Sequence, residues 1–368
     1  MRDKPHRRRR KRFPFIFFAN KNMPWSKIKQ VISEPDFHNE GEGCKRIIGY
    51  DEAIREALQL ALNQDQRVFV MGQGVDDPDG MFGTTRGLHL EFGSERVFDT
   101  PLAEAALTGV AIGAALAGMR PVYFHNRPDF LLLAMDQLVN HAAKWSYMFG
   151  GAVHVPIVIW ACIGRGWGSA AQHSQALQGL FMHIPGLKLV MPGNCCDAKG
   201  LMLAAINDPN PVLIIDHRLN FRLRGLVPAE MYLTPIGKGI IRRSGQDVTI
   251  AAVSHLVMDS LFAAEEAKQL GIEAEVIDIR SLRPLDEDII LNSVAKTGRL
   301  IIADCGWKTA GITAEIGAMV AEKGFPLLKA PIKRVASPDL PAPAACTLEE
   351  TYYIGKKDIK KAILELMQ

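Results

Sequence analysis

The chain has 368 residues, of which 48% are hydrophobic, and a formal net charge of +3. This length and apolar content suffice for two packed domains. The first twelve residues contribute a charge of +7, so the remainder carries −4 and shows no basic surface of the kind that binds nucleic acid. No segment approaches the ~20 consecutive apolar residues that cross a bilayer, so we expect no membrane partner.

The amino terminus has a basic run at residues 2–12, followed by an apolar stretch at 13–19. This order resembles a signal peptide, but the apolar stretch is short, contains Pro14 and lacks a small-residue cleavage site. We predict a basic, disordered extension over residues 1–45, with Met23 as a candidate true start; a targeting segment is the alternative. The six cysteines lack the paired spacing of zinc sites, which indicates reduced thiols in a cytoplasmic protein.

Residues 46–216 alternate short β-branched runs with longer stretches of helical period, which is typical of a parallel sheet with crossover helices. The predicted strands are 67–71, 96–99, 121–125, 156–162, 187–191 and 211–216. The predicted helices are 51–63, 102–118, 129–148, 173–182 and 196–207. We therefore predict a doubly wound α/β domain over this part of the chain.

Residues 217–235 are polar, contain prolines and interrupt the alternation, so we predict a linker there. A second alternating series follows and predicts another doubly wound α/β domain over residues 236–368. Its strands are expected at 248–254, 274–279, 300–304 and 332–335, and its helices at 256–270, 286–296, 311–323 and 356–367.

The segment Asp99-Thr100-Pro101-Leu102-Ala103-Glu104 lies between a predicted strand and a predicted helix. Thr100 is a plausible N-cap and Pro101 suits the first helical position, so Glu104 falls in the first turn. By itself this pattern also fits a purely structural role, in which the glutamate stabilises the start of the helix. Residues 105–118, however, are apolar on all faces and rich in small residues, so we expect that helix to be buried, within the chain or at a subunit interface.

A second candidate is His173, which follows the glycine-rich segment 164–168. A histidine that titrates near neutrality can move protons, although a lone histidine at a helix start is often only a cap. The glycines lack the lysine and hydroxyl pair of a phosphate-binding loop and the dinucleotide spacing, so we interpret this segment as a loop beside the substrate channel.

Together these motifs resemble a known family, the beta subunits of thiamine diphosphate-dependent 2-oxoacid dehydrogenases. The resemblance runs in order from residue 46 to about 365. It rests on the segments 98–104, 118–121, 136–144, 171–175, 185–188, 197–200 and 280–286. It implies a transketolase-like pyrimidine-binding domain followed by a transketolase C-terminal-like domain.

The resemblance also assigns roles to residues. Glu104 would hydrogen-bond the ring nitrogen of the aminopyrimidine and so help to activate the cofactor, and His173 would assist proton movement during acyl transfer. Leu102, Gln73 and Pro128 stand at positions expected to contact the cofactor. A structural potassium ion is implied at backbone carbonyls of four residues: Ile157, Ala205, Asp208 and Asn210.

The chain lacks the Gly-Asp-Gly motif and the following asparagine pair that hold magnesium and the diphosphate in this superfamily. The nearest match, Pro78-Asp79-Gly80, has no first glycine. We therefore expect an alpha subunit to hold the magnesium ion and share the cofactor, in an alpha2beta2 heterotetramer with its sites at subunit interfaces.

The leading hypothesis is oxidative decarboxylation of a 2-oxo acid, with reductive acyl transfer to the lipoyl group of a partner acyltransferase. Two departures from the family keep alternatives open: Gly72-Gln73-Gly74 lacks the usual acidic residue, and Pro128 replaces an aromatic residue, beside His125 and Arg127. The alternatives are a thiamine diphosphate-dependent carboligase or transketolase-like two-carbon transfer, and a non-catalytic beta-like subunit.

Overall fold

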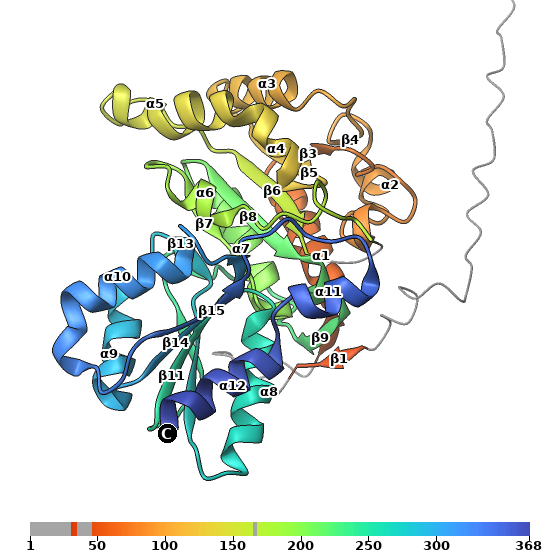
Figure 1. Ribbon diagram of the computed structural model, residues 1–368. Helices are drawn as coiled ribbons and strands as arrows, with labels where there is room; N and C mark the ends of the chain where they lie inside the picture. The colour runs from red at the N-terminus through yellow and green to blue at the C-terminus, as the bar shows by residue number, and fades with distance from the viewer. Residues whose placement is uncertain (1–30, 35–45, 165–167) are drawn as a thin grey trace, which may run out of the picture.

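The computed structural model describes residues 31–34, 46–164 and 168–368. Two largely parallel sheets dominate it, one in the upper and one in the lower part of Figure 1. In the described residues the upper sheet has the order β13-β7-β8-β6-β5-β3-β4. Its strands are β3 (Val68–Gly72), β4 (Val97–Phe98), β5 (Arg120–His125), β6 (Val158–Ile163), β7 (Lys188–Val190), β8 (Val212–His217) and β13 (Ser281–Arg283).

Helices cover this upper sheet, and its central strands are buried along their whole length. The helices are α1 (Tyr50–Gln64), α2 (Leu88–Phe92), α3 (Glu104–Leu116), α4 (Pro128–Leu131), α5 (Ala143–Met148), α6 (Gln178–Met182) and α7 (Cys195–Asn207). α1 packs against α7, while α3 and α4 contact β5. Continuous burial explains why these strands read as uninterrupted apolar runs in the sequence.

The lower sheet has the order β10-β12-β11-β14-β15, in which β10 is the antiparallel member. Its strands are β10 (Ile240–Arg243), β11 (Val248–Ala252), β12 (Ala274–Asp278), β14 (Leu300–Trp307) and β15 (Lys333–Ser337). The helices of this part are α8 (Leu256–Lys268), α9 (Glu287–Thr297), α10 (Ile312–Gly324), α11 (Cys346–Tyr352) and α12 (Lys356–Met367). The predicted α/β class with two doubly wound sheets is therefore confirmed.

Two features of the strand pairing were not predicted. β13 comes from the second half of the chain but pairs antiparallel with β7, at the edge of the upper sheet. The segment predicted as a linker contains β9 (Leu223–Leu226), which lies between β1 (Ile32–Ser33) and β2 (Ile47–Gly49) in a small third sheet. The prediction of a disordered extension otherwise falls on residues 1–30 and 35–45, outside the described residues.

Two predicted helices differ from the observed ones. The helix expected at 129–148 is divided into α4, a 3-10 turn, a π-helical segment at Gln137–Ala142, and α5. A π-turn holds one more residue than an α-turn, a change that apolar periodicity does not reveal. The helix expected at 173–182 begins only at Gln178, so His173 lies on irregular backbone. Among the described helices, none combines the length and apolarity needed to cross a membrane.

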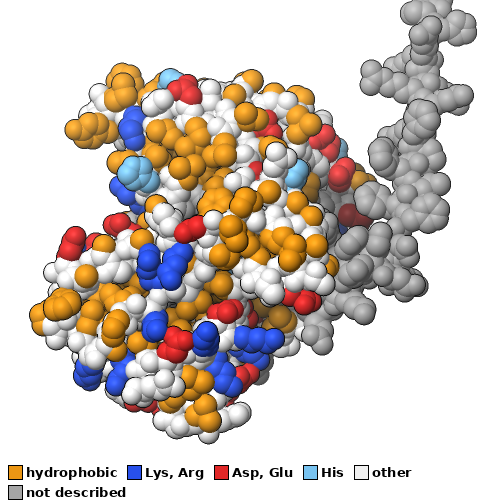
Figure 2. Space-filling view, viewed as in Figure 1, with side chains coloured by type: hydrophobic (Ala, Val, Ile, Leu, Met, Phe, Trp, Pro, Cys, Tyr) orange, Lys and Arg blue, Asp and Glu red, His pale blue; other side chains and the backbone are white. Residues whose placement is uncertain are grey.

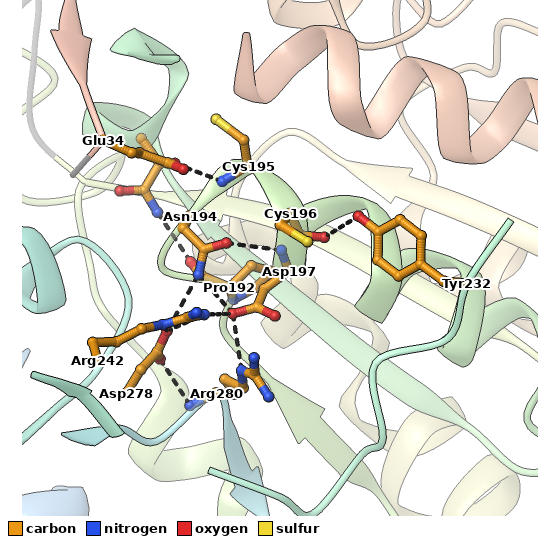
Figure 3. Close-up of polar contacts among 11 residues, drawn as sticks. Glu34, Pro192, Asn194, Cys195, Cys196, Asp197, Tyr232, Arg242, Asp278 and Arg280 are labelled. Atoms are coloured by element: carbon orange, nitrogen blue, oxygen red, sulfur yellow. Dashed lines mark hydrogen bonds and ion pairs between the residues drawn. The ribbon is translucent and has the colours of Figure 1, made fainter. Parts of the chain in front are cut away.

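A buried ionic cluster joins the upper and lower parts (Figure 3). Arg242 on β10 forms ion pairs with Asp197 at the start of α7 and, at 3.3 Å, with Asp278 at the end of β12. Arg280 adds a bond of 2.9 Å to Asp197, and Asn194 caps α7 by accepting from the Asp197 amide. Burial opposes ionisation of Asp197, but the two guanidinium groups hold its pKa below the usual value.

Glu34 attaches β1 beside this cluster, because its Oε1 accepts a hydrogen bond of 2.6 Å from the Cys195 amide. Burial raises the pKa of Glu34 from its ordinary 4.5 to about 7. The folded form thus favours the protonated Glu34 carboxyl group. The stability that this protonated group contributes is fully present below pH 4.5 and is lost as the pH rises through 7.

We predict that attachment of β1 weakens over that pH interval by up to about 3 kcal/mol, and that Glu34→Gln removes the dependence because an amide oxygen accepts the same bond at every pH. The pH dependence of β1 attachment can be measured by hydrogen exchange of residues 31–34 between pH 5 and 8, corrected for intrinsic exchange rates. Glu265→Gln, an exposed change on α8, should keep the wild-type dependence. Retention of that dependence in Glu34→Gln would contradict the assignment.

Candidate active site

One cavity brings together four of the predicted site residues. It has a volume of about 780 Å³, and Gln73, Leu102, Glu104 and His173 all line it. The remaining lining residues are Met81, Phe82, Asn126, Arg127, Phe130 and Arg218. The residues that line the cavity are far apart in the sequence. The parallel sheet and its loops bring them together and so create the cavity.

Glu104 is the first residue of α3, and Ala103 is the N-cap. The helix therefore begins later than expected, and neither Thr100 nor Pro101 belongs to it. The Glu104 carboxylate lies where the backbone amides of a helix start are unpaired, which favours negative charge. Its charge also acts on Tyr123 of β5: burial, together with the charge of Glu104, raises the pKa of that phenol to about 12.

Gln73 and Asn126 follow the carboxyl ends of β3 and β5, which pair in parallel with Gly72 opposite Phe124. Asn126 Nδ2 donates a hydrogen bond of 3.2 Å to Gln73 Oε1. Gly72 permits the approach, because its φ is +144° and a Cβ there would lie 2.4 Å from the Phe124 carbonyl oxygen. The carboxyl ends of parallel strands are where α/β proteins place their ligands.

His173 is exposed at the cavity wall, and α4 positions it. The ring of Phe130 meets the His173 imidazole edge-on, with centroids 5.1 Å apart. Asp129, the preceding residue, accepts bonds from the Gln175 backbone amide at 3.3 Å and from Gln175 Nε2 at 2.7 Å. These contacts fix the irregular backbone on both sides of Ser174 and leave the imidazole facing the cavity.

Two guanidinium groups give the cavity positive charge. Arg127 is only 8% exposed, and its Nη1 donates to the Cys162 carbonyl at 3.2 Å. Arg218, just beyond β8, lies over the Phe82 ring with its guanidinium carbon 5.4 Å from the centroid. Guanidinium groups bind carboxylates through paired, charge-assisted hydrogen bonds, so this wall suits an anionic ligand.

The cofactor contact expected of Pro128 needs correction, and His125, the last residue of β5, also lies outside the cavity. Pro128 is buried at the start of α4 and is not part of the cavity lining; Phe130 lies there instead. His125 is 4% exposed, packs on Tyr123 and lies 3.5 Å from the Thr108 hydroxyl, again outside the lining. Burial lowers the pKa of His125 to about 3, so it adds no positive charge at neutral pH.

Three of the four carbonyls expected to hold potassium accept hydrogen bonds within the chain. Those of Ile157 and Ala205 accept backbone hydrogen bonds from Val212 and Asp208. The Asp208 carbonyl accepts from the Arg120 guanidinium at 3.3 Å, and Lys188 pairs with the Asp208 carboxylate. Asn210 donates its amide to that carboxylate at 2.8 Å. Two cationic side chains therefore lie in this region, but a carbonyl oxygen has two lone pairs, so the potassium site stays a prediction.

Comparison with known proteins identifies the family. Residues 47–224 match the transketolase pyrimidine-binding domain and residues 237–359 the transketolase C-terminal domain. The chain is 45% identical to the acetoin:2,6-dichlorophenolindophenol oxidoreductase subunit beta of Bacillus subtilis (strain 168), over 88% of its own length and 98% of that protein. The chain belongs to the beta subunits of the 2-oxoacid dehydrogenases.

Other relatives of this beta subunit agree. It is 41% identical to the 2-oxoisovalerate dehydrogenase subunit beta of Bacillus subtilis (strain 168), with 88% and 99% of the two chains covered. It is 42% identical to the mitochondrial pyruvate dehydrogenase E1 component subunit beta of Drosophila melanogaster, with 86% and 88% covered. A solved structure of a split gene transketolase, an inactive beta4 tetramer, has the same fold: its TM-score is 0.69 at 21% identity, with 87% of this chain and 98% of that chain covered.

The beta subunit leaves part of its apolar surface bare. α3 buries Thr108, Ala111, Ile112 and Ala115, but its opposite face is exposed, so this chain alone does not bury the helix on all faces, and burial at a subunit interface stays a prediction. The exposed face consists of Ala106, Gly109, Val110, Gly113, Leu116 and Ala117. Figure 2 shows hydrophobic side chains gathered on the upper part of the molecule, where Figure 1 places α3 and α5.

Five lining residues were missed from the sequence as cofactor or catalytic candidates: Met81, Phe82, Asn126, Phe130 and Arg218. Asn126 and Arg218 directly follow β5 and β8, so the rule that parallel sheets bind ligands at the carboxyl ends of strands was an available signal. Phe82 and Phe130 carried no such signal, because their approach to the cavity depends on how the loops after β3 and β5 fold.

Proposed function

We propose that this beta subunit, together with an alpha subunit, forms a thiamine diphosphate-dependent enzyme that oxidatively decarboxylates a 2-oxo acid and transfers the acyl group to lipoamide. The observation that carries the proposal is the single cavity in which Glu104 and His173 face the same space as Arg127 and Arg218. One carboxylate, one imidazole and two guanidinium groups supply the polar chemistry that such a reaction requires of the protein.

The cavity suits the aminopyrimidine half of the cofactor. Phe82, Leu102 and Phe130 offer apolar surface for a ring, and Glu104 offers one fixed hydrogen-bond acceptor. When bound, thiamine diphosphate supplies a nucleophilic carbon that adds to the keto group and accommodates the electrons left by loss of carbon dioxide. The sequence has no Gly-Asp-Gly motif for the diphosphate, so we assign that half and its magnesium ion to the alpha subunit.

Each polar residue then has a distinct task. Glu104, held at the helix start, accepts a hydrogen bond from the pyrimidine ring and keeps it in one orientation. Arg127 and Arg218 bind the substrate carboxylate and hold the keto carbon in the cavity. His173 lies at the exposed wall, where it donates or accepts a proton as the acyl group leaves for its acceptor.

The exposed face of α3 supports an alpha2beta2 assembly. Its small residues let another backbone approach closely, and an exposed apolar surface next to a catalytic cavity is typical of a subunit interface. A lipoyl acyltransferase is the proposed acceptor and the cytoplasm the proposed location. The carboligase alternative was motivated by the altered segment from His125 to Pro128; of that segment, Asn126 and Arg127 line the cavity, whereas His125 and Pro128 do not.

The test uses the full chain purified with its alpha subunit. We expect 2-oxo-acid-dependent release of carbon dioxide and acylation of lipoamide. Carbon–carbon bond formation with an aldehyde acceptor, without lipoamide acylation, would establish the carboligase instead. Absence of both reactions across short, branched and hydroxylated 2-oxo acids would establish the non-catalytic subunit.

We predict that His173→Gln lowers lipoamide acylation by about 100-fold, because the amide keeps the shape but transfers no proton. Release of carbon dioxide in a single turnover should change much less, since that step precedes acyl transfer. Stopped-flow measurement of the two steps separates them. His183→Gln, at another exposed histidine, is the control and should leave both rates at the wild-type level. An equal loss in both steps would contradict the assigned role.

We predict that Gly113→Leu blocks assembly with the alpha subunit without unfolding this chain. No atom lies within 4 Å of the Cβ position at Gly113, so the leucine fits the isolated fold but projects from the α3 face. Co-purification and sedimentation measure the assembly. Ala321→Leu, an exposed change on α10, is the control and should assemble normally. Normal assembly of Gly113→Leu would remove α3 from the proposed interface.

A further inference from the structure

Three potential metal ligands meet between the two sheets, away from the lining of the active-site cavity. His217 is the last residue of β8, His255 is the N-cap of α8, and Cys305 lies within β14. Their ligand atoms all lie within 4.8 Å of one another. The three residues are 2%, 8% and 8% exposed. Two imidazoles and a thiol are the ligands that zinc and other soft or borderline metal ions prefer.

The rings of His217 and His255 stack with centroids 3.7 Å apart and planes 20° apart. Tetrahedral zinc, with Zn–N of about 2.0 Å and Zn–S of about 2.3 Å, requires ligand atoms roughly 3.3 to 3.6 Å apart. Because the three ligand atoms lie within 4.8 Å of one another, only a small closure separates them from these distances. In the stacked arrangement the nitrogen lone pairs lie in nearly parallel planes, so the imidazoles must turn out of the stack before both can bind one ion.

Space for a fourth ligand lies beside the cluster. A cavity of about 10 Å³ has His217, Cys305, Gly164, Ser174 and Tyr353 in its wall. This volume is close to that of a single water molecule. Gly164 keeps the space open, because a Cβ at that position would lie 2.7 Å from His217 Cε1. Three protein ligands with one adjoining water position is an arrangement that zinc commonly adopts.

Some contacts of the three ligands favour binding of a metal ion, and others disfavour it. Gln178 Nε2 approaches Cys305 Sγ at 3.6 Å and donates to it, a contact that stabilises a metal-bound thiolate. The Leu219 amide donates to His217 Nδ1 at 3.2 Å, so this contact must be released, or the ring turned, when the metal enters. Burial and the neighbouring Asp304 raise the pKa of the Cys305 thiol, so binding must displace a proton.

We propose that His217, His255 and Cys305 form a zinc site that ties the upper sheet to the lower part of the chain. On binding, the Cys305 S–H bond breaks, its proton passes to solvent, and the sulfur pair forms the bond to zinc. Because β8 belongs to one sheet and α8 and β14 to the other part, the ion acts as a cross-link and stabilises their arrangement.

The test starts with the full chain, alone and with its alpha subunit, freed of metal by a chelator and titrated with zinc or cobalt(II). We expect one equivalent to bind and to raise the thermal midpoint. Cobalt should show thiolate-to-cobalt charge transfer and the visible bands of a tetrahedral ion. Absence of the thiolate band at one equivalent overturns the site.

Variants locate the ligands. Cys305→Ser should abolish the charge-transfer band and the thermal shift, and His255→Asn should weaken zinc binding by at least about tenfold, because each removes one bond to the ion. Cys346→Ser, at an exposed cysteine, is the matched control and should bind as wild type. Persistence of the band in Cys305→Ser, or its loss in Cys346→Ser, contradicts the assignment.

X-ray absorption of the zinc-loaded wild-type chain requires no variant and so stays informative if a substitution prevents folding. We expect one sulfur and two imidazole nitrogens around the metal. A shell made only of oxygen, or one with two sulfurs, overturns the proposal. None of these measurements depends on 2-oxo acid turnover. The zinc site can therefore be contradicted while the proposed function is supported, and the proposed function can be contradicted while the zinc site is supported.

Discussion

Glu104→Gln in the assembled enzyme should reduce 2-oxo acid turnover by about 100-fold or more, as expected when a preorganised group is removed from a catalytic site. The amide has the shape of the carboxylate but lacks its charge. It can therefore no longer hold the cofactor's pyrimidine nitrogen through a charge-assisted hydrogen bond at the start of α3. The measurement is kcat with saturating thiamine diphosphate and magnesium, so that weaker cofactor binding does not contribute.

The matched control is Glu315→Gln, the same change at an exposed glutamate in the first turn of α10. It should leave kcat unchanged. Both variants should assemble with the alpha subunit and melt close to wild type, because Glu104 forms none of the ion pairs found among the described side chains. Wild-type turnover in Glu104→Gln would exclude the catalytic role and favour the non-catalytic subunit.

Arg242→Met should lower the free energy of unfolding by about 3–5 kcal/mol, the usual effect of removing one partner from a buried ion pair. The Arg242 side chain is 2% exposed, and those of Asp197 and Asp278 are 2% and 0% exposed. Without the guanidinium, two buried carboxylates remain close together with only Arg280 to compensate them. Chemical unfolding of the full chain, followed by circular dichroism, measures the loss.

The neighbouring residue on β10 provides the control. Arg243 pairs with Glu273, whose side chain is 45% exposed, so Arg243→Met should change stability by less than about 1 kcal/mol. Burial and the charge of Asp197 raise the pKa of Asp278. The destabilisation by Arg242→Met should therefore shrink at acidic pH, and adding Asp278→Asn should recover part of it. Equal effects of the two arginine variants would refute the cluster's structural role.

Local sequence patterns correctly predicted much of the fold. The β-branched runs became the buried strands of both sheets, because a strand enclosed by helices is apolar along its whole length. Glu104 and His173 were singled out from short motifs, and the structure places both on one cavity. Boundaries were less accurate: α3 starts at Glu104 rather than at Leu102, since the segment before it follows the turn out of β4.

The sequence by itself determined the α/β class and the candidate glutamate, and its missing Gly-Asp-Gly motif predicts a second chain that holds the diphosphate, because periodicity and motifs are properties of neighbouring residues. Only the tertiary structure decided that Phe130 and not Pro128 lines the cavity, and that Arg218 reaches it. It also brought His217, His255 and Cys305 together, although the cysteine spacing gave no indication of zinc. Such contacts depend on how distant strands are ordered in the sheets, and no short stretch of sequence encodes that order.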